Sequence, residues 1–401
     1  MSERTLQDLQ MKQALPLSVK VLLTKDRIRQ WINEYGEDGV YVSFSGGKDS
    51  TVLLHLVRER YKNVPGVFCD TGLEYPEIRD FVRTFDNITW LKPKMNFRAV
   101  IEKYGYPFIS KEVAERAYYA KKWLTWYESQ SSLDRPTDRP TDRPTDRPTD
   151  RPTDYTIFQF LGIRGKLYRK IRESIPDNVI AEYIRDGGKG ALRLKQMYGI
   201  DYKSSMYNFT HYKYLVLAPF FISNKCCNIM KKNPIHNYET KTGRKPMMAT
   251  MASESKLRTQ KWIANGCNAF NLKRPLSTPM AFWTEQDVLL YIKENNLPLC
   301  SVYGDIVKEE EVDGQLDFKE LGLFDTGQPT LRTTGCTRVG CMFCGFGCHL
   351  PEEPGRFELM KQTHPKQYEW IMKPWDEGGL GYKEVIDWIN EHNGKGKIIR
   401  Y

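Results

Sequence analysis

The sequence has no run of apolar residues as long as the roughly 20 that a membrane-spanning helix needs. Residues 1–15 are polar and of mixed charge, so they do not match a secretory signal peptide. Apolar residues are slightly scarce at 40%, but aromatic residues make up 12%, which is enough to fill a sizeable core. Together these features predict a cytoplasmic protein that does not contact a membrane.

Acidic residues are also in short supply, because 50 of them face 60 lysines and arginines and leave a net charge of +10. A positive balance of this size predicts an anionic partner, either a nucleotide or a nucleic acid. The chain has nine cysteines. In a reducing cytoplasm we expect them to bind a metal or to act in catalysis rather than to form disulfides.

The Walker A pattern, Gly-x-x-x-x-Gly-Lys-Ser/Thr, is missing as well. Instead, the β-forming run 41–44 leads into Ser-Gly-Gly-Lys-Asp-Ser, and residues 51–57 have apolar positions at helical spacing. A strand, a glycine turn and a helix together offer backbone N–H groups and a helix N-terminus to a phosphate. The candidate nucleotide-binding residues of this turn are Ser45, Gly46, Gly47, Lys48, Asp49 and Ser50.

Two further strands are predicted at residues 64–69 and 88–91, with a helix between them. Such alternation is typical of an α/β fold, here a doubly wound, Rossmann-like parallel sheet. Ligands bind these sheets at the carboxyl ends of the strands, where Asp70, Thr71 and Gly72 follow the second strand. The Asp70 carboxylate can hold Mg²⁺ on the phosphates or fix the loop through backbone N–H groups.

We expect three consecutive segments in the chain. Residues 1–35 form helices, residues 36–300 form the nucleotide-binding α/β domain, and residues 301–401 form a cysteine-rich, mostly helical module that binds a metal or cluster. The tetrapeptide Asp-Arg-Pro-Thr occurs five times over residues 134–153. Proline at every fourth position forbids a helix or a central strand, so we expect a disordered, solvated insertion over 134–154.

The remaining elements are predicted from shorter patterns. We expect helices over residues 97–127, 158–183, 190–198 and 282–295, short helices from 358 to 392, and a strand over 214–219. The helices on either side of the repeat are rich in basic and aromatic residues. They are a candidate face for nucleic acid, and a solvated basic surface is an equal alternative.

Four segments now point to one family. Residues 45–50 resemble the pyrophosphate loop of the ATP pyrophosphatase (PP-loop) superfamily. Residues 70–77 resemble the Asp-Thr-Gly-x-x-Phe/Tyr-Pro-Glu segment of the phosphoadenosine phosphosulfate (PAPS) reductase family within it. Residues 282–298 are similar to the Trp-Thr-Glu-x-Asp-Val segment of that family, and residues 226–234 to the Cys-Cys-x-x-x-Lys-x-x-Pro segment of its iron–sulfur reductases.

A fifth segment matches the family in part. Residues 249–258 are similar to its Gly-x-Arg-x-x-Glu-Ser-x-x-Arg, which implies that Glu254 and Arg258 bind nucleotide. The two residues stand four apart and could equally form a structural ion pair on one helix face. Ala249 and Met251 replace the motif's glycine and first arginine, which weakens the case for a sulfate or second phosphate bound as in the reductases.

The cysteines allow two ligand sets. The resemblance implies a [4Fe–4S] cluster held by Cys226, Cys227, Cys341 and Cys344. Spacing alone also permits a local site made of Cys336, Cys341, Cys344 and Cys348, which would hold zinc or a cluster.

The resemblance implies an enzyme that cleaves ATP to AMP and pyrophosphate, with Lys48, Asp49 and Asp70 in catalytic roles and Mg²⁺ on the phosphates. The activated acceptor would then enter an iron–sulfur-assisted sulfur transfer, for which a nucleic acid would suit as acceptor and a sulfur donor protein as partner. Two alternatives stay open: a sulfonucleotide reductase that releases sulfite, and a non-catalytic nucleotide- or nucleic-acid-binding subunit. The intact Lys48-Asp49 pair favours ATP chemistry, because the reductases typically alter this loop.

Overall fold

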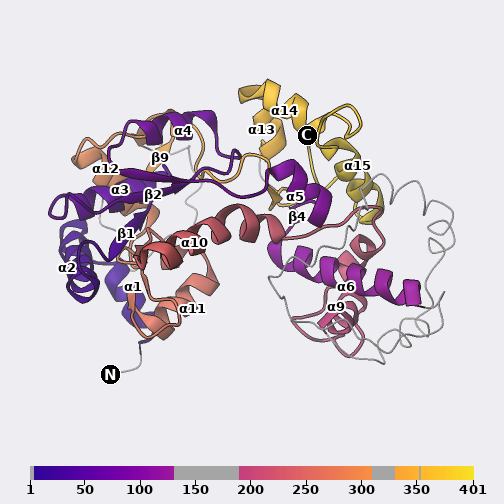
Figure 1. The fold of residues 1–401 in the computed structure, drawn as a ribbon, viewed down its shortest axis with the longest axis horizontal. Helices are drawn as coiled ribbons and strands as arrows, with labels where there is room; N and C mark the ends of the chain where they lie inside the picture. Colours follow the sequence, from indigo (N-terminus) through magenta and orange to yellow (C-terminus); the bar gives the residue numbers. More distant parts are fainter. Residues whose placement is uncertain (1–3, 131–188, 309–329, 352–353) are drawn as a thin grey trace, which may run out of the picture. The chain divides into compact units, whose positions relative to one another are not determined.

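The computed structural model describes residues 4–130, 189–308, 330–351 and 354–401 (Figure 1). The tetrapeptide repeat and the helix predicted over 158–183 lie outside these described residues. The chain divides into two compact units, each assembled from two separate stretches. The first unit contains Met1–Lys94 and Lys231–Met342, and the second contains Met95–Met230 and Phe343–Tyr401. This division does not coincide with the three consecutive segments that the sequence predicts.

A six-stranded sheet forms the centre of the first unit, with the strands in the order β3-β2-β1-β5-β7-β6. The strands are β1 (Val40–Ser43), β2 (Gly66–Cys69), β3 (Ile88–Leu91), β5 (Lys245–Met247), β6 (Asn268–Ala269) and β7 (Leu276–Ser277). All neighbouring pairs are parallel except β6 with β7. The predicted doubly wound parallel sheet is therefore confirmed.

The direction in which strands are added to this sheet reverses at β1. The chain first builds β2 and β3 on one side of β1 and later returns to pair β5 with its other edge. In open α/β sheets this reversal opens a crevice at the carboxyl ends of the central strands, where ligands bind. The turn at residues 45–50 lies at this switch point.

Helix α3 (Lys48–Arg58) packs on β1, and α2 (Leu17–Tyr35) and α12 (Glu285–Glu294) pack on α3. The indole Nε1 of the buried Trp283 donates to Thr24 Oγ1 at 2.8 Å. Nearby, Lys20 on α2 forms a buried ion pair with Asp287 on α12 at 2.8 Å. These contacts join α2, one of the helices found in the predicted segment 1–35, to a segment more than 250 residues later.

The rest of the first unit consists of short elements. It holds α1 (Leu6–Gln13), α4 (Pro76–Arg83), α10 (Asn233–Thr242), α11 (Lys256–Asn265) and an antiparallel pair, β8 (Ile306–Lys308) with β9 (Leu331–Thr333). Across the described part of the chain, every helix falls short of the length or apolar content that a membrane span requires.

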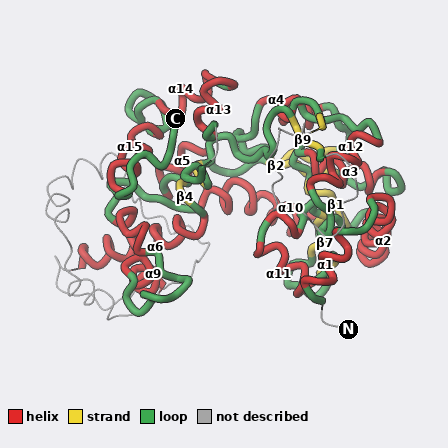
Figure 2. The backbone as a smooth tube through the Cα atoms, turned by 180° about the vertical axis from the view of Figure 1, so that it is seen from behind, coloured by secondary structure: helices red, strands yellow, loops and turns green. Residues whose placement is uncertain are grey.

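Figure 2 shows that the second unit consists mainly of helices and loops, with one short pair of strands. It contains α5 (Phe97–Tyr104), α6 (Lys111–Gln130), α9 (Lys189–Tyr198), α13 (Arg356–Thr363), α14 (Pro365–Met372), α15 (Tyr382–His392) and the parallel pair of β4 (Phe108–Ile109) with β10 (Gly345–Phe346). Helix α9 lies directly against α6, because Gly190 leaves room for Trp123.

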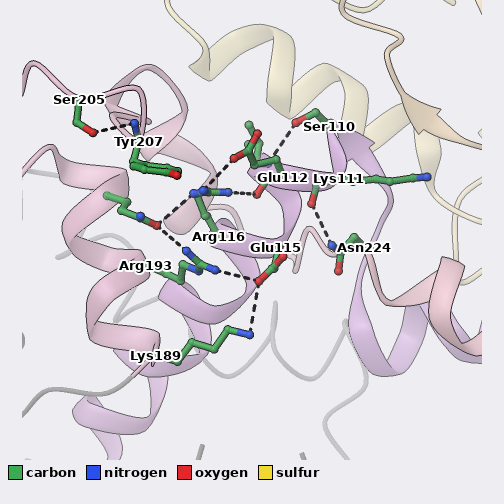
Figure 3. A network of polar contacts seen from close by, with 12 residues as sticks. Ser110, Lys111, Glu112, Glu115, Arg116, Lys189, Arg193, Ser205, Tyr207 and Asn224 are labelled. Atoms are coloured by element: carbon green, nitrogen blue, oxygen red, sulfur yellow. Dashed lines mark hydrogen bonds and ion pairs between the residues drawn. The ribbon is translucent and has the colours of Figure 1, made fainter. Parts of the chain in front are cut away.

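A polar network holds the first turns of α6 to α9 (Figure 3). Arg116 donates to Gln196 Oε1 at 3.1 Å, pairs with Glu112 at 2.9 Å and stacks on the ring of Phe209 at 4.1 Å. Arg193 pairs with Glu115 at 3.2 Å. Part of the basic and aromatic surface predicted around the repeat is thus engaged in contacts within the unit.

One predicted strand is wrong. Residues 214–219 were expected to be extended, but a 3₁₀ helix, η1, covers Thr210–Val216. Its buried Leu215 and Val216 contribute to the packing of η1 on α6 and α9. A short apolar run is compatible with a buried strand and with a buried helical turn, so only the packing decides between them.

Candidate functional site

The glycine turn has a backbone shape that other residues would resist. Gly46 has a φ of +71°, and a Cβ there would stand 2.7 Å from Val82 Cγ2. Helix α3 begins directly after it, and its N-cap residue, Gly47, has no side chain with which to cap the helix. The turn therefore brings a helix N-terminus without a capping side chain from its own N-cap residue to the carboxyl end of β1, which is a candidate anion site.

The two serines of the turn hold it in shape. Ser50 Oγ donates to Gly47 O at 2.9 Å and accepts from the backbone N–H of Ser45 at 3.2 Å. Ser45 Oγ accepts from the Gly47 N–H at 3.3 Å. These hydroxyls substitute for the backbone partners that a tight turn lacks.

Lys48 brings a positive charge to the same place. Its side chain is buried, its Nζ donates to Thr337 O at 2.8 Å, and it pairs with Glu285 at 3.0 Å. The Lys48 N–H donates to the hydroxyl of Tyr303 at 3.2 Å. Sequence reasoning missed Thr337, Glu285 and Tyr303 as site residues, although Glu285 lies in the segment 282–298.

The Asp49 carboxylate is buried, which disfavours its charged form. Burial raises its pKa, and Glu285 adds to this, while Lys48 and the guanidinium groups of Arg338 and Arg258 oppose it. Its Oδ1 is buried and makes no hydrogen bond among the described residues. An orphaned carboxylate oxygen beside a glycine turn is the type of ligand that Mg²⁺ prefers. The donor chemistry at this position therefore fits the magnesium ion implied by the family resemblance.

Glu254 and Arg258 lie beside the glycine turn as well. They form the ion pair that their spacing allows, and the Met251 N–H donates to the same carboxylate at 3.0 Å. Arg338 Nη2 approaches Glu254 Oε1 at 3.6 Å. Sequence reasoning overlooked Arg338, because it read residues 336–348 only for their cysteines.

The turn after β2 is held by its own side chains. Asp70 Oδ1 accepts from the Gly72 N–H at 3.2 Å, and Oδ2 pairs with Arg79 at 3.1 Å. Thr71 Oγ1 donates to Glu74 at 2.8 Å. Of the two roles foreseen for Asp70, this structure displays the loop-fixing one.

A cavity of about 130 Å³ lies at the carboxyl ends of β1 and β2. It is lined by Ser45 from the glycine turn, by Cys69 and Glu74, by Lys231, and by Val339 and Gly340. Lys231 approaches Glu74 at 3.6 Å. Burial raises the pKa of the Cys69 thiol to about 12, so this thiol is protonated at neutral pH and forms a neutral wall.

The predicted cysteine ligands are divided between the units. Cys226, Cys227, Cys344 and Cys348 belong to the second unit, whereas Cys336 and Cys341 belong to the first. Burial raises the pKa of the Cys344 thiol, and Cys227 adds to this shift. Three of the four thiols in the second unit also act on the buried Tyr382, whose pKa is raised first by burial and then by Cys344, Cys226 and Cys348.

Each ligand set predicted for these thiols takes residues from both units. Within the described residues, there is no group of three or more Cys, His, Asp or Glu side chains arranged to hold a metal ion. Thiolates are the right donors for a [4Fe–4S] cluster or zinc, and both ligand sets stay predictions from the sequence. We therefore assign no chemical step to a cluster.

The family model of the phosphoadenosine phosphosulfate reductase domain matches residues 39–117 and 193–345, more than half of the chain. A 73-residue stretch is 41% identical to an uncharacterized protein of Methanocaldococcus jannaschii, covering 17% of this chain and 18% of that protein. The chain thus matches less than a fifth of the length of this relative.

Among solved structures, the phosphoadenylyl-sulfate (PAPS) reductase of Candida auris, determined as a phosphate complex, is similar with a TM-score of 0.31 and 12% identity. The similarity covers 69% of this chain and 82% of that chain. A TM-score and an identity this low carry no argument, so the family assignment depends on the family model alone. The unmatched stretch 118–192 contains the tetrapeptide repeat.

Proposed function

The chain belongs to the phosphoadenosine phosphosulfate reductase domain family, and from this premise we propose that it binds ATP at the glycine turn after β1 and cleaves it to AMP and pyrophosphate. One observation carries the proposal: Lys48 and Asp49 stand side by side at the start of α3, on the turn at the switch point of the sheet. A cation beside a carboxylate with an orphaned oxygen suits a magnesium polyphosphate.

The proposed reaction exchanges one bond at the α-phosphorus of ATP. An acceptor hydroxyl oxygen forms a bond to this phosphorus and gives its proton to solvent, while the bond to the bridging oxygen breaks and pyrophosphate leaves with the electron pair. The product is an adenylated acceptor, and AMP leaves with the electron pair of its bond to the acceptor when a sulfur nucleophile or water attacks that acceptor. The N–H groups of the turn, the N-terminus of α3 and the Lys48 ammonium would stabilise the charge that develops on pyrophosphate. Phosphate oxygens would replace the Glu285 carboxylate as the partner of Lys48.

Asp49 has the second role in this proposal. Its orphaned Oδ1 would hold Mg²⁺, and the ion would neutralise charge on the phosphates. Asp70 would act indirectly, because it fixes the turn that borders the cavity. The cavity at the ends of β1 and β2 is our candidate for the nucleoside portion of the ligand.

The test is release of AMP and pyrophosphate from ATP, measured with candidate acceptors that include single- and double-stranded nucleic acids. We expect Lys48→Ala to lower the rate by about 10²- to 10³-fold, because it removes the positive charge on the leaving group. Lys62→Ala is the matched control, since this exposed lysine lies outside the site. Absence of ATP binding by the purified wild-type protein would overturn the proposal.

A sulfonucleotide reductase is the second candidate function. It is favoured by the presence of Cys226, Cys227, Cys344 and Cys348 in one unit. Sulfite release from adenylyl sulfate or its 3′-phosphate, in the presence of a thiol reductant, would support it against ATP cleavage.

Sulfur transfer assisted by an iron–sulfur cluster remains a prediction from the sequence. Anaerobic purification, followed by absorption spectroscopy and by iron and sulfide analysis, tests whether the cysteines hold a cluster. Loss of the spectrum in Cys226→Ser would favour the long-range ligand set. A spectrum that survives in Cys226→Ser and disappears in Cys336→Ser would favour the local set.

A further inference from the structure

The stretch 189–230 of the second unit is strongly basic, with six lysines and arginines and one acidic residue. Four of these cations contact an acidic or aromatic partner within the unit: Lys189, Arg193, Lys195 and Lys225. The other two, Lys203 and Lys213, are exposed and form no ion pair with any described residue. Uncompensated positive charge is therefore left on the surface over residues 203–213.

The loop between α9 and η1, which carries Lys203, is held by hydrogen bonds at both ends. Asn208 Nδ2 donates to Lys203 O at 2.9 Å, and Asn208 Oδ1 accepts from the Thr210 N–H at 3.0 Å. The Phe209 N–H donates to Gln196 O on α9 at 2.9 Å. Because these contacts already order the loop, a ligand would bind it at little further cost in backbone entropy.

Two large side chains of this loop are open to solvent, since Met206 is 84% exposed and Tyr207 is 44% exposed. The guanidinium of Arg116 lies over the Tyr207 ring, 6.0 Å from its centroid (Figure 3). The Tyr207 N–H donates to Ser205 Oγ at 3.1 Å, which fixes the backbone that carries the ring. A partly exposed aromatic ring in a fixed position is a platform on which a nucleic-acid base can stack.

We propose that Lys203, Tyr207 and Lys213 form a binding face for single-stranded nucleic acid. A base would stack on the Tyr207 ring, and the two ammonium groups would neutralise phosphates of the strand. A single strand fits better than a duplex, whose bases are stacked on one another and offer no free face to a tyrosine. The exposed ring also favours nucleic acid over an acidic peptide, which would match the lysines and leave the ring without a partner.

The position of this face within the second unit adds to the argument. The face borders the cysteine-rich segment of that unit, since the Tyr212 ring stands edge-on to the ring of His349 with the centroids 6.4 Å apart. It contains no residue of the proposed ATP site, so it stands or falls independently of ATP cleavage.

The experiment is equilibrium binding of fluorescently labelled oligothymidine and oligouridine of about 12 nucleotides to the full chain, without ATP. We expect Tyr207→Ala to weaken binding by about 5- to 150-fold and to leave its salt dependence unchanged, because the variant loses stacking and no charge. Tyr207→Phe keeps the ring and should bind within about twofold of the wild type.

The two lysines are tested together. Lys203→Ala/Lys213→Ala should make the slope of log binding constant against log salt concentration shallower by about 1.4, since each phosphate contact on a single strand contributes about 0.7. The matched control, Lys366→Ala/Lys395→Ala, removes the same charge from two other exposed lysines of the second unit and should leave the slope unchanged. Equal thermal unfolding midpoints establish that the variants are folded.

Tighter binding of oligouridine or of oligothymidine identifies RNA or DNA as the source of the strand. The binding face is overturned if neither oligonucleotide binds, if Tyr207→Ala binds as the wild type does, or if the two lysine double variants change the slope equally. It is also overturned if polyglutamate binds as tightly as the oligonucleotides and loses as much in Tyr207→Ala, since the face would then dock an acidic protein. Because ATP is absent from the assay, failure to bind oligonucleotides leaves the ATP proposal standing, and failure to bind ATP leaves the binding face standing.

Discussion

At Asp49 the protein keeps a charged group where burial opposes its charge. Oδ1 has no hydrogen-bond partner among the described residues, and the nearest cation, Lys48, is itself engaged by Thr337 and Glu285. A buried carboxylate of this kind costs stability in the free protein and is useful only when a cation or a substrate arrives. Asp49 is therefore a residue at which function and stability are expected to oppose one another.

We predict that Asp49→Asn raises the thermal unfolding midpoint at neutral pH by a few degrees and abolishes magnesium-dependent ATP binding. The pKa of Asp49 is raised in the folded state above its ordinary value of 3.8. Below that value Asp49 is protonated in both the folded and the unfolded state, so its burial costs no electrostatic free energy. The cost of burying the charged carboxylate grows as the pH rises through the folded pKa. The stability gain of the variant should thus shrink as the pH falls towards 4.

The control for this measurement is Asp38→Asn, which changes a fully exposed carboxylate in the same unit. Calorimetric scans of the two variants and the wild type between neutral and mildly acidic pH provide the comparison. A gain for Asp49→Asn that is independent of pH would contradict the burial argument.

Single residues of the site were predictable to different degrees. Lys48 and Asp49 follow from local spacing, because a glycine turn between a strand and a helix fixes its own geometry. Arg338, Tyr303 and Glu285 were missed, because each comes from a loop or helix start brought to the turn only by tertiary folding. A motif describes its own neighbours in the chain and contains no information about which distant segment will fold over it.

At the scale of elements, residues 283–287 at the start of α12 connect this helix both to α2 and to the glycine turn. Thr284 and Asp287 form a capping box at the start of α12, and Asp287 also pairs with Lys20. Trp283 binds Thr24 on the same helix α2. Glu285, between them, reaches Lys48. These contacts therefore link the position of α2 to the glycine turn.

We predict that Asp287→Ala destabilises the protein by about 3–5 kcal/mol, because it leaves the Lys20 ammonium buried without its partner and also removes the Asp287 half of the capping box. Denaturant unfolding measures the change. The double variant Lys20→Met/Asp287→Ala should recover part of the loss, since no unpaired charge is then buried. A double variant less stable than Asp287→Ala would contradict this account.

Elements were predicted well where their pattern is long and poorly where it is short. The strands and helices of the first 94 residues follow from their periodicity and their flanking turns. Two-stranded β8–β9 and the 3₁₀ helix at 210–216 could not be predicted, because three or four apolar residues fit several conformations. The choice between them depends on partners that lie far away in the sequence.

On the scale of the whole molecule, the chain passes from one unit to the other three times, at residues 94–95, 230–231 and 342–343. Composition changes along the chain and does not reveal such interleaving, so it predicted consecutive segments. Two of the passages fall close to the Cys226-Cys227 pair and inside the Cys-x-x-Cys of Cys341 and Cys344. The cysteine-rich segments are therefore also the connections between the units.

We predict that deletion of residues 134–153 leaves folding and ATP binding largely intact. The repeat offers no apolar surface to bury, and the charges of Asp and Arg cancel within each tetrapeptide. Its removal should therefore shorten a connection without removing any part of a hydrophobic core. Soluble yield, the thermal unfolding midpoint and the ATP dissociation constant are the measurements. A deletion variant found only in inclusion bodies would contradict the prediction.

The strand order of the first sheet has a consequence for synthesis. The second edge of β1 cannot pair until β5 has been synthesised, and β5 leaves the ribosome about 150 residues after β3. At about 5–20 residues per second, the β1 edge stays open for roughly 8–30 s. An open parallel edge is a template for pairing with other nascent chains. We therefore expect co-expression of a chaperone that binds nascent strands to raise the soluble yield of the full chain, and to have little effect on refolding of a finished chain from denaturant at low concentration.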